Sequence, residues 1–530
     1  MLINSLNFVI FVAIVCVLYF IFPKKAKWFV LLVASYIFFW LSSNKLIIFL
    51  LITTLSIYLG ALLIGRIDKK TKEKCKIIES KEEKKKIKNK AKIKKKLVIL
   101  AIILINFGIL AGLKYSNFIV GNLNSLLRVF NMSIEVPFQK IILPLGISYY
   151  TLQAVSYVID VYRGKYEADK NLGRVALFVS FFPQIVEGPI GRYEDLANQL
   201  YQPHQFNYQN AKFGMQLMLW GYFKKMVIAD RAALFVNEVF TNYEQYAGVP
   251  IFLAIVFYTV QIYAEFSGCM DIVRGTAQIM GINMAENFER PFFSKSVQEF
   301  WRRWHITLGK WLKDYVFYPV SFSKVTMNLT NFSKKIFKNT YIAKLIPAMF
   351  ALFFVWLGNG IWHGASWKYI FYGLYYYIIM IIGMLLEPLG NKIIELLKIK
   401  KENFGYRLWQ MIRTTGFVLI GMLIFRADSL KKAFQMFLSI FTVENMSMIF
   451  NGKLYNIGFE TADFIVLIIG IIMIFVVGLL QEKGYHLREK ISKQNLIFRW
   501  SLYYIMIFAI VLLGIYGPGY KVSDFIYGQF

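Results

Sequence analysis

The chain has 530 residues, of which 57% are hydrophobic and 18% aromatic, and it carries a formal net charge of +30. A water-soluble globular protein cannot bury so much apolar surface, so this composition excludes a soluble domain and indicates a membrane protein. Three scattered cysteines also exclude a disulfide framework and a cysteine-rich metal centre.

Apolar stretches long enough to cross a membrane recur from the start of the chain almost to its end. A spanning helix needs about 20 apolar residues, and we expect roughly ten to twelve such helices. The clearest stretches are 6–22, 46–64, 97–113, 346–367 and 462–480. Because no Ser- or Pro-rich linker divides the chain, residues 1–530 are predicted to form a single polytopic membrane domain.

Basic residues predict the orientation of the chain in the membrane. Lys24, Lys25 and Lys27 follow the first apolar stretch, which places this flank in the cytoplasm and the N-terminus outside. Segment 66–96 is dominated by Lys and Glu and is predicted to be a cytoplasmic loop near anionic lipid. The alternative, a nucleic-acid-binding patch, is disfavoured because this segment lacks stacking aromatic residues.

Segment 174–191 interrupts the series of spans. Its apolar core is too short to cross a membrane, and it contains Pro183 and Pro189. We therefore expect a re-entrant or interfacial segment here.

The histidines are the first candidates for proton-transfer chemistry, because imidazole titrates near neutral pH. The sequence contains only four, namely His204, His305, His363 and His486. His363 lies in the stretch GNGIWHGASW at the end of an apolar run, where Gly358, Gly360 and Gly364 allow a backbone or a ligand to approach closely. A functional group is favoured here over a structural histidine that merely hydrogen-bonds a neighbouring helix.

His305 lies in the stretch SVQEFWRRWHITLGKWLKDY. Helical spacing predicts that Trp301, His305 and Leu308 form one apolar stripe, with Arg302 and Arg303 on the more polar side. Such a helix could anchor the chain at the membrane interface, or its cations could attract the phosphates of a cytoplasmic acyl donor.

Charged residues also occur inside apolar segments. Asp271 and Arg274 have the spacing of an ion pair on one helix face, and Glu265 lies nearby. Lys224 and Lys225 are predicted to snorkel or to meet Asp230. We expect these charges to be structural.

Several motifs together resemble the membrane-bound O-acyltransferases. They are LPLGISYYTLQAVSYVIDVYRG, FFPQIVEGPIGRY, QIYAEFSGCMDI, EFWRRWHITLGKWLKDY and the WHG of residues 362–364. The resemblance covers most of residues 143–373 and is strongest to the bacterial alginate O-acetylase branch, which is related to the D-alanyl transferase for teichoic acids. The final residues DFIYGQF are also similar to the end of that branch, whereas segments 68–96 and 321–338 depart from it.

This resemblance implies an all-α membrane fold, with a ring of about eleven transmembrane helices and re-entrant or interfacial helices around a central tunnel. The catalytic core would lie at about 141–426. His363 corresponds to the family's catalytic histidine, which we expect to act as the general base, and His305 to its second characteristic polar position. The residues expected to line or support the tunnel for substrate and donor are Trp301, Arg302, Arg303, Trp304, Trp362 and Glu187.

The implied function is a membrane O-acyltransferase of the bacterial cell membrane. It would pass an acyl group, expected to be acetyl, from a cytoplasmic thioester such as acetyl-coenzyme A to an extracytoplasmic cell-wall polymer or exopolysaccharide. We expect a separate extracytoplasmic esterase-like acyltransferase and membrane lipids as partners, with no nucleic acid, no metal and no bound cofactor. Two alternatives remain: a D-alanyl transferase for teichoic acid, and a transporter or flippase without covalent chemistry.

Overall fold

The computed structural model describes residues 1–338, 340–443 and 445–516. Every regular element in these ranges is helical, and the only pairing of strand type among them is an isolated bridge between Phe288 and Trp304. The predicted all-α class is therefore confirmed, as expected for a chain whose backbone groups must be paired inside a bilayer. The DFIYGQF sequence at 524–530 lies outside the described residues.

The chain divides into two compact units. The first unit contains residues 1–215 and 273–285. The helices that lie wholly within it are α1 (Leu6–Ile21), α2 (Lys27–Ser43), α3 (Ile47–Ile77), α4 (Lys81–Lys114), α5 (Ser116–Val129), α6 (Ile147–Arg163), α7 (Leu172–Ser180), α8 (Phe182–Ile185) and α9 (Tyr193–Tyr201). Two short 3-10 turns, η1 (Lys24–Ala26) and η2 (Asn44–Leu46), flank α2.

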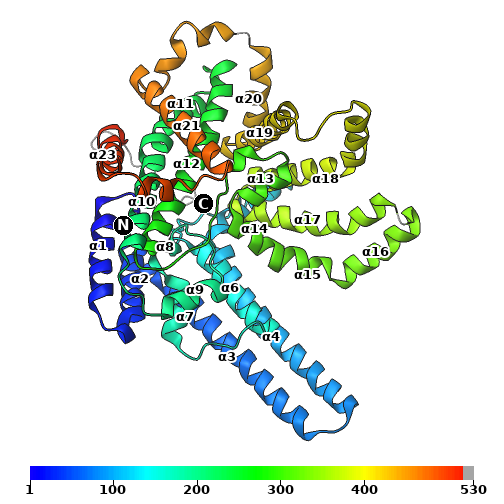
Figure 1. Ribbon diagram of the computed structural model, residues 1–530. Helices are drawn as coiled ribbons and strands as arrows, with labels where there is room; N and C mark the ends of the chain where they lie inside the picture. Colours follow the sequence, from blue (N-terminus) through cyan, green and yellow to red (C-terminus); the bar gives the residue numbers. More distant parts are fainter. Residues whose placement is uncertain (339, 444, 517–530) are drawn as a thin grey trace. The chain divides into compact units, whose positions relative to one another are not determined.

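The Lys-rich segment 66–96 is helical except at residues 78–80, and its predicted cytoplasmic location stays a prediction. It forms the end of α3 and the beginning of α4, and these two helices make a long antiparallel hairpin (Figure 1). Lys and Glu are good helix formers, so a charged connection between two apolar segments can itself be helical. Ser80 caps α4 by accepting a hydrogen bond from the Glu83 amide, and Lys95 pairs with Asp68 across the hairpin at 2.7 Å.

Segment 174–191 is broken into two short helices, α7 and α8, that meet at Phe181. Pro183 lies at the start of α8, where its missing N–H is tolerated. The segment is not among the helices long enough to cross a membrane, as predicted.

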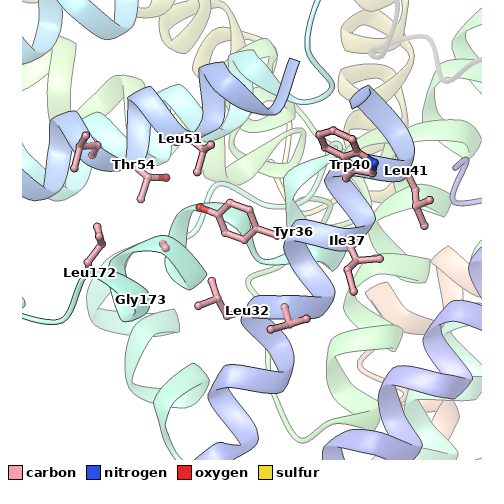
Figure 2. Close-up of a pocket in the computed structure, with 12 residues that line it drawn as sticks. Leu32, Tyr36, Ile37, Trp40, Leu41, Leu51, Thr54, Leu172 and Gly173 are labelled. Atoms are coloured by element: carbon pink, nitrogen blue, oxygen red, sulfur yellow. The ribbon is translucent and has the colours of Figure 1, made fainter. Parts of the chain in front are cut away.

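An apolar groove lies between α2, α3 and α7 in the first unit (Figure 2). Its volume is about 750 Å³, and Tyr36 of α2 points across it toward Thr54 of α3. The rest of its lining is almost entirely hydrocarbon, and none of the candidate site residues belongs to it. The groove therefore offers no group for acyl transfer.

The second unit contains residues 216–272 and the described part of 286–530. Helices α10 (Tyr208–Tyr222) and α12 (Val249–Ile279) belong to both units. The longer elements of the second unit are the π-helix η3 (Phe223–Ala229), α11 (Asp230–Thr241), α13 (Val297–Arg303), α14 (Ile306–Leu312), the π-helix η5 (Lys313–Phe317), α15 (Tyr318–Ser321), α16 (Lys324–Phe337), α17 (Tyr341–His363), α18 (Trp367–Leu396), α19 (Phe404–Arg426), α20 (Leu430–Thr442), α21 (Thr461–Glu482), α22 (Leu487–Ser492) and α23 (Leu496–Leu513). Its 3-10 turns are η4 (Pro291–Phe293), η6 (Met446–Ile449) and η7 (Lys453–Asn456).

Eight helical segments of the described residues are long and apolar enough to cross a membrane. They are Lys24–Ile77, Lys81–Lys114, Val249–Ile279, Tyr341–His363, Trp367–Leu396, Phe404–Arg426, Thr461–Glu482 and Leu496–Leu513. The first of them contains both α2 and α3, and α1 is apolar but has only 16 residues. The chain is thus a multi-pass membrane protein, and the number of about eleven spans stays a prediction.

Candidate active site

His363 is the last residue of α17, and its position depends on close packing between α17 and α18. A Cβ atom added to Gly360 would lie 2.4 Å from the carbonyl oxygen of Tyr369, and one added to Gly364 would lie 2.3 Å from the Tyr369 ring. Two of the three glycines predicted to allow a close approach, Gly360 and Gly364, are therefore required for the packing of these helices. Gly358 is different, because a Cβ there would meet its nearest neighbour at 4.0 Å.

The imidazole of His363 is 3% exposed and lies among aromatic rings. Its centroid is 5.7 Å from Tyr372 of α18, 5.2 Å from Phe425 of α19 and 5.0 Å from Trp362. All three contacts are edge-to-face, an arrangement that aromatic rings favour. The packing of these three aromatic rings therefore holds the imidazole in one orientation.

His305 interrupts the helix that the sequence predicted. It has φ 47° and ψ 52°, in the left-handed region, and it separates α13 from α14. The continuous apolar stripe through Trp301, His305 and Leu308 is therefore wrong. A non-glycine residue in this region costs on the order of 1–3 kcal/mol and persists only where its surroundings impose it.

Asn287 imposes the conformation at His305. The backbone carbonyl of Asn287 accepts the Ile306 N–H at 3.1 Å, and its side-chain oxygen accepts both the N–H and the hydroxyl of Thr307, at 2.9 and 2.7 Å. The Asn287 amide then donates to the Met270 sulfur at 3.1 Å. Tertiary hydrogen bonds therefore override the local helical preference of the sequence.

The His305 ring is 3% exposed and packs edge-on against Phe266 of α12, with 4.8 Å between ring centroids. Burial lowers the pKa of His305 to about 3, so the ring is neutral at physiological pH. A neutral imidazole has one N–H donor and one nitrogen acceptor.

Trp362 joins the two histidines. The centroid of its indole lies 5.6 Å from the His305 ring and 5.0 Å from the His363 ring. The structure thus brings together three of the residues predicted for the site, although His305 is far from the other two in the sequence.

The two other predicted tryptophans, Trp301 and Trp304, pack in different places. Trp301 packs at 4.8 Å from Tyr376 and 6.3 Å from Tyr372, so it belongs to the aromatic cluster beside His363. Trp304 packs instead against Phe288, at 5.0 Å, and is almost fully buried. Trp301 is therefore placed near the site, whereas Trp304 supports the loop that carries His305.

The two predicted arginines also differ. Arg303 pairs with Glu299 at 2.7 Å and with Glu482 at 3.0 Å, so its positive charge is neutralised by carboxylates of the protein itself. Arg302 is exposed and has no ion pair among the described residues. Arg302 is thus the better placed of the two for contact with a donor.

Glu187 belongs to the first unit, whereas both histidines belong to the second. It is 1% exposed and directly follows α8. The turn beside it is tight, since a Cβ on Gly188 would lie 2.5 Å from the Gln184 backbone. The predicted place of Glu187 beside the tunnel stays a prediction.

A buried charge network lies where α12 packs against η3. Lys225 is fully buried and pairs with Asp230 at 2.9 Å and with Glu265 at 2.8 Å. Lys224 pairs with Asp271 at 2.7 Å. The predicted contact of Lys225 with Asp230 is confirmed, but snorkelling is wrong because both lysines are buried. The pairing of the two lysines with the acids of α12 was not predicted, although the presence of two cations and two acids in neighbouring apolar segments was the available signal.

The remaining two histidines, His204 and His486, lie outside the aromatic cluster around His363. His204 has a ring nitrogen 2.8 Å from the Gln199 carbonyl in the first unit, and His486 is exposed before α22. Among the described residues, no group of three or more His, Cys, Asp or Glu side chains is arranged to hold a metal ion. The candidate chemistry therefore rests on His305 and His363.

These features define a class: a multi-pass helical membrane protein with two buried histidines against one indole, in an aromatic enclosure suited to proton transfer away from water. The model of the membrane-bound O-acyltransferase family matches residues 168–330, which include His305. Relatives at about 30% identity extend the match over most of the chain. The chain belongs to the membrane-bound O-acyltransferase family and is an O-acyltransferase.

Three relatives illustrate the similarity. The probable alginate O-acetylase AlgI of Pseudomonas aeruginosa is 31% identical over 434 residues, covering 80% of this chain and 72% of the relative. The peptidoglycan O-acetyltransferase of Helicobacter pylori is 27% identical, covering 67% of this chain and 66% of the relative. The teichoic acid D-alanyltransferase of Bacillus subtilis is 28% identical, covering 53% and 68%. Family membership favours covalent acyl transfer over the transport alternative.

Proposed function

We propose that this O-acyltransferase passes an acetyl group from a cytoplasmic thioester, such as acetyl-coenzyme A, to a hydroxyl destined for an extracytoplasmic cell-wall polymer or exopolysaccharide. The arrangement that carries the proposal is the pair of buried histidines on one indole. The relatives named for O-acetylation of alginate and peptidoglycan support acetyl as the group transferred.

His363 is the general base of the proposed reaction. The acceptor hydroxyl loses its proton to His363 as its oxygen attacks the thioester carbonyl carbon. The carbon–sulfur bond then breaks, and the thiolate takes the proton from His363, so that an ester and a thiol leave the site. Burial among Trp362, Tyr372 and Phe425 keeps water away from the thioester.

His305 stabilises the developing charge. Because burial lowers its pKa to about 3, the ring stays neutral and donates one N–H. This N–H would bind the thioester carbonyl oxygen as that oxygen becomes an oxyanion. Such an interaction contributes about 10²- to 10³-fold to the rate in other acyl-transfer enzymes. Its rigid backbone suits this role, since a fixed donor requires no reorganisation during the reaction.

The donor is attracted by exposed cations around α13 and α14. Arg302, Lys310 and Lys313 are exposed, whereas Arg303 is paired with carboxylates. Phosphates of coenzyme A or of a phosphopantetheine arm are anions that such cations bind. In this arrangement the protein lies in the bacterial cell membrane with its N-terminus outside, and a separate extracytoplasmic esterase-like acyltransferase completes the transfer to polymer.

The test uses wild type, His363→Ala and His305→Ala purified in detergent with the cognate outer transferase and radiolabelled acetyl-coenzyme A. We expect a fall in labelled polymer of about 10²- to 10⁴-fold for His363→Ala, the usual contribution of a general base. His486→Ala is the matched control, because that histidine is exposed, and it should retain full transfer. Full transfer by His363→Ala would refute the proposed role.

D-alanyl transfer is the second candidate, supported by the similarity to the Bacillus subtilis teichoic acid D-alanyltransferase. It uses the same histidines but a different donor, namely D-alanine on a carrier protein. Supplying wild type with each labelled donor in turn separates the two. Label from acetyl-coenzyme A supports acetyl transfer, and label only from the carrier supports D-alanyl transfer.

A further inference from the structure

Asn359 is a buried polar residue of α17 that neither the motifs nor the proposed mechanism uses. It is 6% exposed and lies one helical turn before His363. Its side-chain oxygen is fully buried and has no hydrogen-bond partner among the described residues. A buried carbonyl oxygen without a donor destabilises a fold, so its retention beside the site calls for a specific reason.

The position of Asn359 on the helix places it between the two histidines. With 3.6 residues per turn, Trp362 is displaced by about 60° to one side of Asn359 and His363 by about 40° to the other. Trp362 contacts His305, and His363 contacts Tyr372, so these two directions bound the site. Asn359 therefore lies on the sector of α17 that faces the reacting groups.

The geometry of a helix also brings the Asn359 and His363 side chains together. Residues at i and i+4 are neighbours on a helix surface. Helical side chains lean toward the N-terminus, which for a residue at position 363 is the direction of the turn that carries Asn359. The Asn359 carboxamide is thus within reach of the His363 ring by rotation of its own side chain.

We propose that Asn359 is a positioning residue for His363, and that its carboxamide oxygen accepts a ring N–H of His363 while that ring holds the acceptor's proton. The proposal rests on the proposed general-base role of His363. One ring nitrogen of the neutral imidazole takes the acceptor's proton, while the other nitrogen already carries the N–H that Asn359 would accept, and this N–H becomes a stronger donor once the ring is charged. When the proton passes from the first nitrogen to the leaving thiolate, the ring returns to its neutral form and the hydrogen bond to Asn359 weakens.

A carboxamide suits this position better than a carboxylate would. Its oxygen is a neutral acceptor, so it is buried without the cost of a buried charge. It also does not hold the proton on His363 as strongly as a carboxylate, and the proton must move on to sulfur. Asn359 would thereby fix the ring and stabilise its charged form only while the reaction requires it.

The test compares Asn359→Leu with wild type in the labelled-acetyl assay. Loss of a hydrogen bond to a charged group predicts a fall in kcat of about 10- to 100-fold, with KM for donor and acceptor unchanged. Asn359→Asp keeps an accepting oxygen at the same place but holds the proton on His363 more strongly, so its kcat should lie between those of Asn359→Leu and wild type. In the His363→Ala background, Asn359→Leu should cause no additional loss, because its effect acts through the ring.

Thr414→Val is the matched control. Thr414 of α19 also has a buried hydroxyl without a partner among the described residues, but it lies about 16 Å along the helix from Phe425. This variant should retain wild-type kcat. Asn359→Ala, which adds no bulk, repeats the measurement if Asn359→Leu does not fold.

Three outcomes overturn the proposal: an unchanged kcat in both Asn359→Leu and Asn359→Ala, a rise in the acceptor KM alone, or losses that add fully to those of His363→Ala. The first outcome together with an inactive His363→Ala refutes only the role of Asn359. Full activity of His363→Ala instead refutes the general-base function on which it rests.

Discussion

The two histidines of the site contact the same indole but are held by different forces. His363 is fixed by helix packing, since glycines let α17 and α18 approach until aromatic rings enclose the imidazole. His305 is fixed by the hydrogen bonds that Ile306 and Thr307, the next residues in the chain, donate to Asn287, and it adopts a left-handed backbone conformation as a result. The first arrangement depends on volume, and the second on polar groups, so different substitutions should disrupt each of them.

The largest effect is expected on the packed side, from Gly360→Ala. The new Cβ would lie 2.4 Å from the Tyr369 carbonyl oxygen, a backbone atom that cannot move aside alone. Separation of α17 and α18 would displace His363, and a displacement of about 1 Å can cost about 10²-fold in rate. Overpacking should also lower stability by about 1–3 kcal/mol. Labelled-acetyl transfer and thermal unfolding in detergent measure the two effects.

Gly358→Ala is the control for this substitution. A Cβ at Gly358 would meet Leu312 at 4.0 Å, an ordinary contact. Activity should remain at the wild-type level, and stability should be equal or higher because Ala favours helix by about 1 kcal/mol over Gly. Equal behaviour of the two variants would contradict positioning of His363 by close packing.

A smaller effect is expected on the hydrogen-bonded side, from Asn287→Leu. The Thr307 N–H and hydroxyl would lose their shared acceptor inside the protein, at a cost of about 1–3 kcal/mol. Displacement of the His305 ring should also lower the rate of transfer by about 10-fold, which corresponds to about 1.4 kcal/mol in the activation free energy. Asn287→Asp retains the accepting oxygen and should lose less.

A double-mutant cycle shows whether Asn287 acts through His305. In the His305→Ala background, Asn287→Leu should cause no additional fall in rate, since the ring it positions is already absent. The cycle is measured from the transfer rates of wild type, the two single variants and the double variant at a saturating concentration of the acyl donor. Fully additive losses would show that Asn287 supports the fold without positioning His305.

The smallest effect is expected on stability, and it separates the role of the backbone conformation at residue 305 from the role of the His305 side chain. His305→Gly and His305→Ala both remove the ring and should lose activity equally. The left-handed conformation costs an alanine about 1–2 kcal/mol that glycine does not pay, so the Gly variant should be the more stable by about 1 kcal/mol. Thermal unfolding of the two variants provides the comparison. Greater stability of the Ala variant would place residue 305 in a helix.

Much of the helical architecture could be predicted from the sequence. Stretches 6–22, 46–64, 97–113 and 462–480 all lie in helices, because continuous hydropathy requires no knowledge of tertiary contacts. The motif around His363 likewise indicated the glycines that permit close helix packing. These features are local in the chain, or belong to a recognisable family pattern.

The break at His305 could not be predicted from its own neighbours. The residues around it have an apolar helical spacing, and the hydrogen bonds that override this spacing come from Asn287. The partner of Lys224 was missed for the same reason, since Asp271 lies on a later helix. Where a residue distant in the sequence determines the local backbone conformation, the spacing of apolar residues indicates only the local helical preference that the tertiary contacts override.

The buried ion pairs between η3 and α12 have a consequence for biosynthesis. If α12 entered the bilayer alone, Glu265 and Asp271 would each oppose insertion, and an acidic side chain at a helix centre costs about 2.5–3.5 kcal/mol. Lys224 and Lys225 are synthesised before α12, so their charges are available when it emerges from the ribosome. We therefore expect the charges of Glu265 and Asp271 to be neutralised by the two lysines as α12 assembles with η3, before the active site forms.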